Sequence, residues 1–209
     1  MEDKIKNVLS KMEWLGHDTF KITDDIVIYT DPYQLEGELQ KADLILITHD
    51  HYDHLSLDDI EKIKKDDRAI VGPPDCMAKC TGLISINVGE EKEVKGIKIK
   101  AVPSYNIDKN FHPKEKNWVG YIFTIDDVRL YHAGDTDNIP EMEDFTVDIA
   151  LLPVSGTYVM NASEAIDAAS KINPKLAIPM HYGAIVGSKS DAEKFKKALE
   201  GKIEVHIFE

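Results

Sequence analysis

The sequence has few cysteines and no long apolar run. Two cysteines in 209 residues, Cys76 and Cys80, are too few for a disulfide framework or a four-sulfur zinc site. We expect both to be reduced thiols packed on one short helix. No stretch approaches the roughly 20 apolar residues that a membrane-spanning helix needs, and Met1–Ser10 lacks the apolar centre of a signal peptide. These absences predict a cytoplasmic protein without a membrane partner.

Basic residues are scarce relative to acidic ones. There are 25 basic and 38 acidic residues, a net charge of −13. Such a surface repels phosphate backbones and anionic lipid, which argues against a nucleic-acid partner. The remaining composition, 43% hydrophobic and 30% charged, is typical of a globular protein and excludes a disordered chain. Because no linker, low-complexity tract or repeat divides the chain, we expect one domain over residues 1–209.

Short β-branched runs alternate with short amphipathic helices along the chain. The predicted strands are Glu13–Leu15, Phe20–Thr23, Ile26–Thr30, Leu44–Thr48, Ala69–Val71, Ile97–Val102, Val119–Ile125, Val128–Tyr131, Ile149–Pro153, Leu176–Pro179 and Ile203–Phe208. The predicted helices begin at capping residues and are Ser56–Lys65, Asn161–Ile172 and Ser190–Gly201. Asp126-Asp127 predicts a hairpin turn. This order of elements predicts an α/β fold with mixed sheets.

The most informative segment is Thr48-His49-Asp50-His51-Tyr52-Asp53-His54, which places three histidines and two carboxylates within seven residues. It directly follows the buried-looking strand Asp43-Leu44-Ile45-Leu46-Ile47 and precedes the helix that Ser56 caps. The carboxyl end of a strand is where α/β sheets place ligand-binding groups. Imidazole and carboxylate together suit zinc, manganese, iron or nickel. The segment therefore predicts a metal centre rather than a solvated loop.

His49, His51, Asp53 and His54 form the pattern H-x-H-x-D-H, and on this pattern the chain resembles the metallo-β-lactamase-fold superfamily. Further segments agree in the expected order: Trp14-Leu15-Gly16-His17 with Asp31-Pro32, then Gly134-Asp135-Thr136, then Pro179-Met180-His181-Tyr182-Gly183. The first of these is similar to the branch that contains L-ascorbate-6-phosphate lactonase and N-acyl-phosphatidylethanolamine phospholipase D. The resemblance implies a four-layer αβ/βα sandwich with a dinuclear metal site along one edge.

The resemblance also implies how the ligands divide between two divalent cations, with zinc favoured over manganese, iron or nickel. The ligands implied for the first cation are His49, His51 and a further histidine. Those implied for the second cation are Asp53, His54 and His181, and Asp135 is implied to bridge the two. The further histidine is an open choice, since the loop after Val102-Pro103 offers Asn106 first and His112 later. We favour His112, because imidazole is a much better ligand than an amide oxygen.

The implied reaction is hydrolysis of a small ester, lactone or phosphodiester by a hydroxide that bridges the two cations. Asp53, Asp135 and His132 are the expected catalytic residues. His132 is open between a proton-transfer role and a packed strand residue, and His17 is equally open between function and structure. We expect His206 to be structural. An anionic small-molecule substrate is compatible with the acidic chain, because two dications would dominate the local field.

Three alternatives share the same fold. An incomplete first site would leave a one-metal binding or sensing module without hydrolysis. A di-iron redox protein is disfavoured, because relatives of that kind have a glutamate where this chain has His51. A nuclease is disfavoured by the net charge of −13. Relatives often form homo-oligomers, so we also expect a homo-oligomer.

Overall fold

Two mixed β-sheets form the centre of the protein in the computed structural model, which describes residues 2–208. The first sheet has the order β1-β2-β3-β4-β5-β6, with β1 (Met12–Trp14), β2 (Phe20–Thr23), β3 (Val27–Thr30), β4 (Leu44–Leu46), β5 (Ala69–Gly72) and β6 (Ile84–Ser85). The second has the order β13-β12-β11-β10-β9-β8-β7, with β7 (Glu91–Val94), β8 (Ile97–Pro103), β9 (Val119–Ile125), β10 (Val128–His132), β11 (Ile149–Pro153), β12 (Leu176–Met180) and β13 (Glu204–Val205). Each sheet begins antiparallel and ends parallel, at β3–β6 and at β10–β13.

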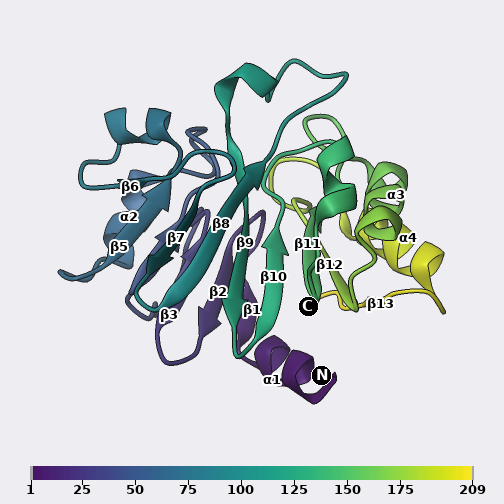
Figure 1. Ribbon diagram of the computed structural model, residues 1–209, viewed down its shortest axis with the longest axis horizontal. Coiled ribbons are helices and arrows are strands. Elements are labelled where there is room, and N and C mark those ends of the chain that lie inside the picture. Colours follow the sequence, from purple (N-terminus) through teal and green to yellow (C-terminus); the bar gives the residue numbers. More distant parts are fainter. Residues whose placement is uncertain (1, 209) are drawn as a thin grey trace.

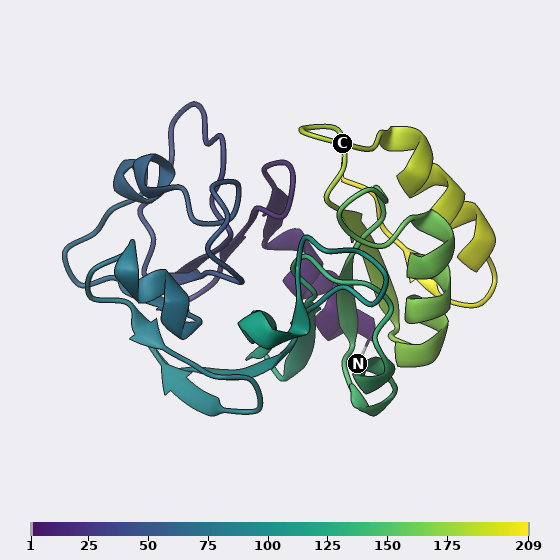
Figure 2. The same ribbon diagram turned by 90° about the horizontal axis from the view of Figure 1, so that it is seen from above.

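Helices cover part of the outer face of each sheet. They are α1 (Glu2–Ser10), α2 (Leu57–Lys62), α3 (Ala162–Ile172) and α4 (Lys189–Leu199), with short 3-10 turns η1 (Pro74–Ala78), η2 (Lys114–Lys116) and η3 (Pro140–Asp144). Helix α1 lies at the lower end of the strands in Figure 1. Helix α2 lies on one side and α3 and α4 lie on the other, with the strands between them (Figures 1 and 2). The predicted four-layer αβ/βα sandwich is therefore confirmed. Within residues 2–208, no helix combines the length and the apolar character that crossing a membrane would need.

The alternation of side chains along β4 explains the layers. Leu44 and Leu46 belong to the large core between the two sheets, whereas Ile45 belongs to a separate cluster with Ile60 of α2 and Ile63. Successive side chains of a strand point to opposite faces of its sheet. A strand that is apolar at every position can therefore serve two cores at once. Burial of β4 on both faces fixes the place of the histidine-rich loop that follows it.

Several local predictions are confirmed and one is corrected. Asp126 and Asp127 adopt left-handed backbone angles, with φ of 50° and 63°, and form the hairpin turn between β9 and β10. Cys76 and Cys80 are both buried free thiols on or just after η1. The predicted start of the last helix at Ser190 is wrong. Helix α4 begins after Ser188, whose backbone N–H donates to Oδ2 of Asp191 at 2.9 Å.

Candidate metal centre

The candidate ligands gather where parallel strands of both sheets end. Asp31 follows β3, the loop 49–54 follows β4, Asp135 follows β10 and His181 follows β12. Parallel strands of one sheet end at the same edge, so the side chains that follow them come together in space. This edge lies uppermost in Figure 1. Residues far apart in the sequence, contributed by both sheets, therefore meet at a single place.

His49, His51 and His112 form one group, in which the possible ligand atoms all lie within 4.8 Å of one another. Nε2 of His49 and Nδ1 of His51 are 3.0 Å apart. The indole of Trp118 packs against both rings, with centroids 4.8 Å from His49 and 4.7 Å from His51. The Trp118 N–H donates a 2.6 Å hydrogen bond to Asp75, which holds the indole in place. This group could supply three imidazole nitrogens to one cation.

The carboxylate of Asp135 lies between this group and a second pair of histidines. Its Oδ2 is 3.1 Å from Nε2 of His112 and 3.2 Å from Nε2 of His181. Its Oδ1 is 3.4 Å from Nε2 of His54. One carboxylate thus reaches a histidine of the first group and two histidines beyond it. A carboxylate shared by two cations would need this arrangement.

Each of four histidines is held from behind at its Nδ1. The pairs are His49 with Thr48 Oγ1 at 3.0 Å, His54 with Asp31 Oδ2 at 2.9 Å, His112 with Asn106 Oδ1 at 3.2 Å, and His181 with Ser155 Oγ at 2.8 Å. Asp31 and Asn106 offer only oxygen acceptors in these pairs, so Nδ1 of His54 and His112 must carry the proton. Each Nε2 is then left to face the centre, as in most metal-binding histidines.

Asp31 fixes the start of the histidine-rich loop. Its Oδ1 accepts a 2.8 Å bond from the Thr48 N–H, and its Oδ2 accepts a 2.6 Å bond from the Thr48 hydroxyl. Because that hydroxyl donates to Asp31, it must accept from Nδ1–H of His49, which settles the tautomer of His49. The sequence offered only a weak signal for this role, an aspartate directly after a predicted strand.

His112 and Asn106 occupy different places. Nε2 of His112 faces Asp135, whereas Oδ1 of Asn106 accepts from the His112 backbone N–H at 2.9 Å. The amide nitrogen of Asn106 donates to the carbonyl oxygen of Tyr158 at 2.9 Å. The structure therefore brings His112 into the cluster and places Asn106 behind it, as a support for the imidazole.

Asp53 lies beside the cluster and pairs with His17. Its Oδ2 is 3.2 Å from Nε2 of His17 and 3.9 Å from Nε2 of His54. Burial raises the pKa of Asp53, but the bond from His17 and the charge of His54 outweigh burial and lower it. His17 is itself buried, and its ring centroid is 4.1 Å from that of His181. The structure thus draws His17 into the centre, in a close group with His54 and His181.

Asp18 is a buried carboxylate that the sequence did not single out. Neither of its oxygens has a hydrogen-bond partner among the described residues, and Oδ2 lies 4.0 Å from Nδ1 of His54. Nε2–H of His132 donates to the Asp18 carbonyl oxygen at 2.8 Å. His132 is fully buried in β10 against Phe20, and none of the close ligand groups within residues 2–208 includes it. The structure therefore places His132 behind the turn that carries Asp18.

The imidazoles of the centre differ in their protonation. Burial lowers the pKa of His49 well below its ordinary value, and the nearby charge of His54 lowers it further. Burial also lowers the pKa of His51. Both rings are therefore neutral at pH 7, the form that binds a metal.

The opposite holds on the other side of Asp135. Burial alone would lower the pKa of His181, but the carboxylates of Asp135 and Asp18 outweigh it and raise the pKa to about 9. Burial also opposes a charge on His54, yet Asp135 and Asp31 raise its pKa well above the ordinary value. The protonated, positively charged forms of His54 and His181 are therefore favoured, and both rings lie where the second cation would bind.

Three residues of the centre adopt the left-handed backbone region that favours glycine. The φ angles are 50° at His17, 36° at Asp31 and 58° at His181. Such conformations cost roughly 1–3 kcal/mol each for other residues and persist only where the surroundings enforce them. The carbonyl oxygen of His17 accepts bonds from the Trp14 indole at 2.9 Å and from the His181 N–H at 3.0 Å. These bonds tie two of the strained residues together.

The geometry fits bound cations. Two nitrogens bound to one tetrahedral zinc at about 2.0–2.1 Å lie about 3.3 Å from each other. The separation between His49 and His51 and those between Asp135 and its three histidines range from 3.0 Å to 3.4 Å, whereas Asp53 Oδ2 lies 3.9 Å from Nε2 of His54. Nε2 of His54, Nε2 of His112 and Oδ1 of Asp135 are buried without a hydrogen-bond partner among the described residues. Buried polar atoms of this kind are costly unless a ligand satisfies them, and imidazole with carboxylate suits divalent transition metals.

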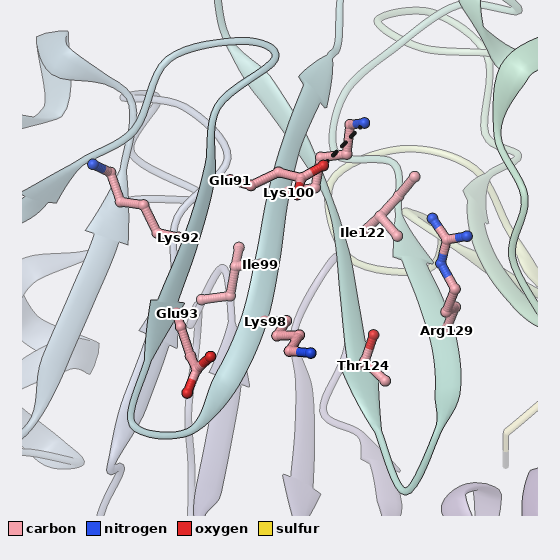
Figure 3. A pocket seen from close by; sticks show the side chains of 9 residues that line it. All are labelled: Glu91, Lys92, Glu93, Lys98, Ile99, Lys100, Ile122, Thr124 and Arg129. Carbon is pink, nitrogen blue, oxygen red and sulfur yellow. Dashed lines mark ion pairs between the residues drawn. The ribbon is translucent and has the colours of Figure 1, made fainter.

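A pocket of about 260 Å³ opens onto this cluster, and its lining includes His51, Asp53, His112 and Asp135. A larger hollow of about 370 Å³ lies on the outer face of β7–β10 (Figure 3). Its side chains carry mixed charges, including an ion pair of 3.2 Å between Lys100 and Glu91. Its lining contains no histidine. The smaller pocket is therefore the one next to the candidate chemistry.

Comparison with known proteins agrees with this geometry. Residues 11–181 match the family described as the β-lactamase superfamily domain. A metal-dependent hydrolase from Thermococcus onnurineus is 35% identical over 94% of this chain and 95% of its own length. A crystal structure of a metal-dependent hydrolase from Parabacteroides distasonis superposes with a TM-score of 0.86 at 35% identity, over 94% of this chain and 91% of that one. A metallo hydrolase from Ignicoccus hospitalis gives 0.79 at 27% identity, over 95% and 94%.

Proposed function

Because this chain belongs to the metallo-β-lactamase superfamily, as a metal-dependent hydrolase, we propose that it cleaves a small ester, lactone or phosphodiester with two divalent cations. One observation carries the dinuclear part of the proposal. The Asp135 carboxylate lies within 3.4 Å of three imidazole nitrogens, on His54, His112 and His181. Zinc is the proposed metal, because the donors are imidazole and carboxylate.

When bound, two such cations lower the pKa of a water molecule toward about 7 and polarise the bond under attack. The residues of the chain do the positioning. Thr48, Asp31, Asn106 and Ser155 hold the imidazoles in place, and the first three also fix their tautomers. Asp135 would hold the two cations at a fixed separation.

Asp53 is the residue that we propose for proton transfer. It lines the pocket, and its Oδ2 accepts from Nε2–H of His17. A carboxylate held there would take a proton from the attacking water and pass it to the leaving oxygen. His132 would act at a distance as a positioning residue, since its bond to the Asp18 carbonyl fixes the turn that carries His17.

Metal analysis combined with one substitution tests the proposal. Protein purified without chelator should contain about two equivalents of zinc per chain. It should hydrolyse at least one of three nitrophenyl substrates: an acetate ester, a bis-phosphodiester, or a lactone followed by pH indicator. Asp135→Asn should lose about one equivalent and at least about 100-fold in turnover. Asp148→Asn is the matched control, because Asp148 is a largely buried aspartate that pairs with Lys175 outside the centre.

Two outcomes would contradict the proposal. A single equivalent after loading with excess metal, without turnover, would favour a one-metal binding module. Tightly bound iron without hydrolysis would favour redox chemistry on the same fold.

A further inference from the structure

Exposed apolar side chains gather around the pocket beside the candidate metal centre. Tyr52, Phe111 and Ile185 line that pocket and are 68%, 47% and 37% exposed. Large apolar side chains are usually buried, and an exposed group of them commonly marks a binding site. Tyr52 belongs to the histidine-rich loop, Phe111 directly precedes His112, and Ile185 follows His181 by four residues. Three loops that carry candidate ligands therefore each contribute one exposed apolar side chain to the same pocket.

Aromatic contacts hold part of this rim in place. The ring of Phe111 meets the ring of Tyr158 edge to face, with centroids 4.7 Å apart. Tyr52 meets Tyr33 in the same way at 5.9 Å. Ring pairs of this geometry stabilise each other beyond simple burial. The rim is therefore a preformed apolar wall, of the kind that binds an apolar part of a ligand with little loss of side-chain freedom.

The pocket offers no side-chain cation to a substrate. Within residues 2–208, its lining contains neither lysine nor arginine. Two lysines on the loop that carries Phe111 are already paired. Lys109 lies 2.7 Å from Asp137, and Lys114 lies 2.9 Å from Glu141. A phosphate or carboxylate at the far end of a substrate would find no partner here and would lose its hydration on entry. The lining therefore disfavours substrates that carry a charged group away from the bond to be cleaved.

From this wall and its lack of cations, we propose that the substrate is a neutral carboxylic ester or lactone with a small aryl or alkyl group packed against Phe111, Tyr52 and Ile185. The inference rests on the proposed hydrolase function and narrows its substrate class. A volume of about 260 Å³ suits a small group, since drug-sized ligands occupy roughly 300–1,000 Å³. Water cleaves the acyl C–O bond: its oxygen joins the acyl carbon as the bond to the leaving oxygen breaks. One of its protons goes to the leaving oxygen, the other is released as the new carboxylic acid ionises, and no group is oxidised or reduced.

A matched pair of esters tests the inference on the zinc-loaded full chain. p-Nitrophenyl valerate and p-nitrophenyl hemiglutarate share a leaving group and a five-carbon acyl chain, but only the second ends in a carboxylate. We expect kcat/KM for the valerate to exceed that for the hemiglutarate at least about tenfold. Phe111→Ala should lower the valerate value about tenfold, mainly through KM, and leave the hemiglutarate value nearly unchanged.

Two further variants separate pocket chemistry from damage to the fold. Ile185→Lys introduces a cation at the rim and should raise kcat/KM for the hemiglutarate while lowering it for the valerate. Met77→Ala is the matched control, because Met77 is 52% exposed on η1 and lies outside the pocket lining. It should change neither value.

Equilibrium dialysis with the two corresponding p-nitroanilides distinguishes this inference from the proposed function, since these analogues report binding whether or not hydrolysis occurs. Preferential binding of the neutral anilide, weakened by Phe111→Ala, supports the apolar pocket even if neither ester is cleaved, and only the hydrolase proposal would then fail. Equal binding and equal cleavage of neutral and anionic compounds, unchanged in Phe111→Ala, would overturn the apolar pocket and leave the hydrolase proposal standing.

Discussion

At the scale of single residues, protons compete with the second cation but not with the first. His49 and His51 have lowered pKa values and are neutral at pH 7, whereas His181 has a pKa of about 9. His181 must release its proton to bind a metal, so protons oppose binding below about pH 9 and cease to do so above it. The two halves of the centre should therefore respond differently to pH.

We expect the first equivalent of zinc to bind with nearly the same affinity at pH 7, 8 and 9. The second equivalent should bind at least about tenfold more tightly for each pH unit up to about 9, because His181 releases a proton and His54, whose pKa is also raised, releases another. Competition with a chromophoric chelator, corrected for the chelator's own protonation, measures both affinities. Two equivalents that respond equally to pH would contradict the assignment of the rings.

The residues that bear on the chemistry were only partly visible in the sequence. The segment Thr48–His54 carries its signal in seven consecutive residues, between a strand and a helix. Ser155 and Asn106 carry no such signal. Ser155 matters because the end of the neighbouring strand brings His181 to within 2.8 Å of it, and Asn106 matters because its own loop folds back and brings His112 to within 3.2 Å. Asp18 was missed for the same reason, since its surroundings come from segments distant in the sequence.

At the scale of elements, strands that are buried on both faces were predicted well. β9 and β11 were predicted at the bounds the structure shows, because continuous apolar runs identify such strands. The edge strand β7, Glu-Lys-Glu-Val, is mostly charged, and the two residues of β6 are too few to show a period, so neither was predicted. Helix α1 was not predicted either. It buries only Ile5 and Val8 and follows no capping motif among the described residues.

The cap of helix α3 gives a prediction at this scale. Oδ1 of Asn161 accepts from the N–H groups of Ser163 and Glu164, and Glu164 accepts from the Asn161 N–H. Asn161→Ala should therefore lower the free energy of unfolding by about 1 kcal/mol. Urea unfolding followed by circular dichroism measures the change. Ser163→Ala is the control, since its side chain makes no capping bond, and an equal loss in both variants would contradict the role of the cap.

At the scale of the whole molecule, the candidate ligands join the two sheets. His49 and His54 follow a strand of the first sheet, whereas Asp135 and His181 follow strands of the second. A cation bound by both sets would therefore bind the folded protein far better than the unfolded chain, in which the ligands are scattered. Metal binding should act as a link between the layers.

Zinc at about 100 times its dissociation constant should stabilise the fold by about 2.7 kcal/mol. For a chain of this length, that corresponds to a rise in Tm of about 5–10 °C. Scanning calorimetry with zinc and with chelator measures the difference. Asp135→Asn should show a clearly smaller rise, and an equal rise in the variant would contradict a cation shared through Asp135.

The left-handed backbone at His17, Asp31 and His181 lowers the stability of the fold at positions whose side chains belong to the centre, so selection for stability and selection for metal binding oppose each other there. Glycine would relax each position and make the bare chain more stable, by roughly 1 kcal/mol or more at each. It would also delete a side chain of the centre. A lineage freed from the need to bind metal could therefore gain stability by drifting toward glycine at these positions. Two histidines and an aspartate held in this conformation lower the stability of the fold, so we expect them to persist only under selection for metal binding.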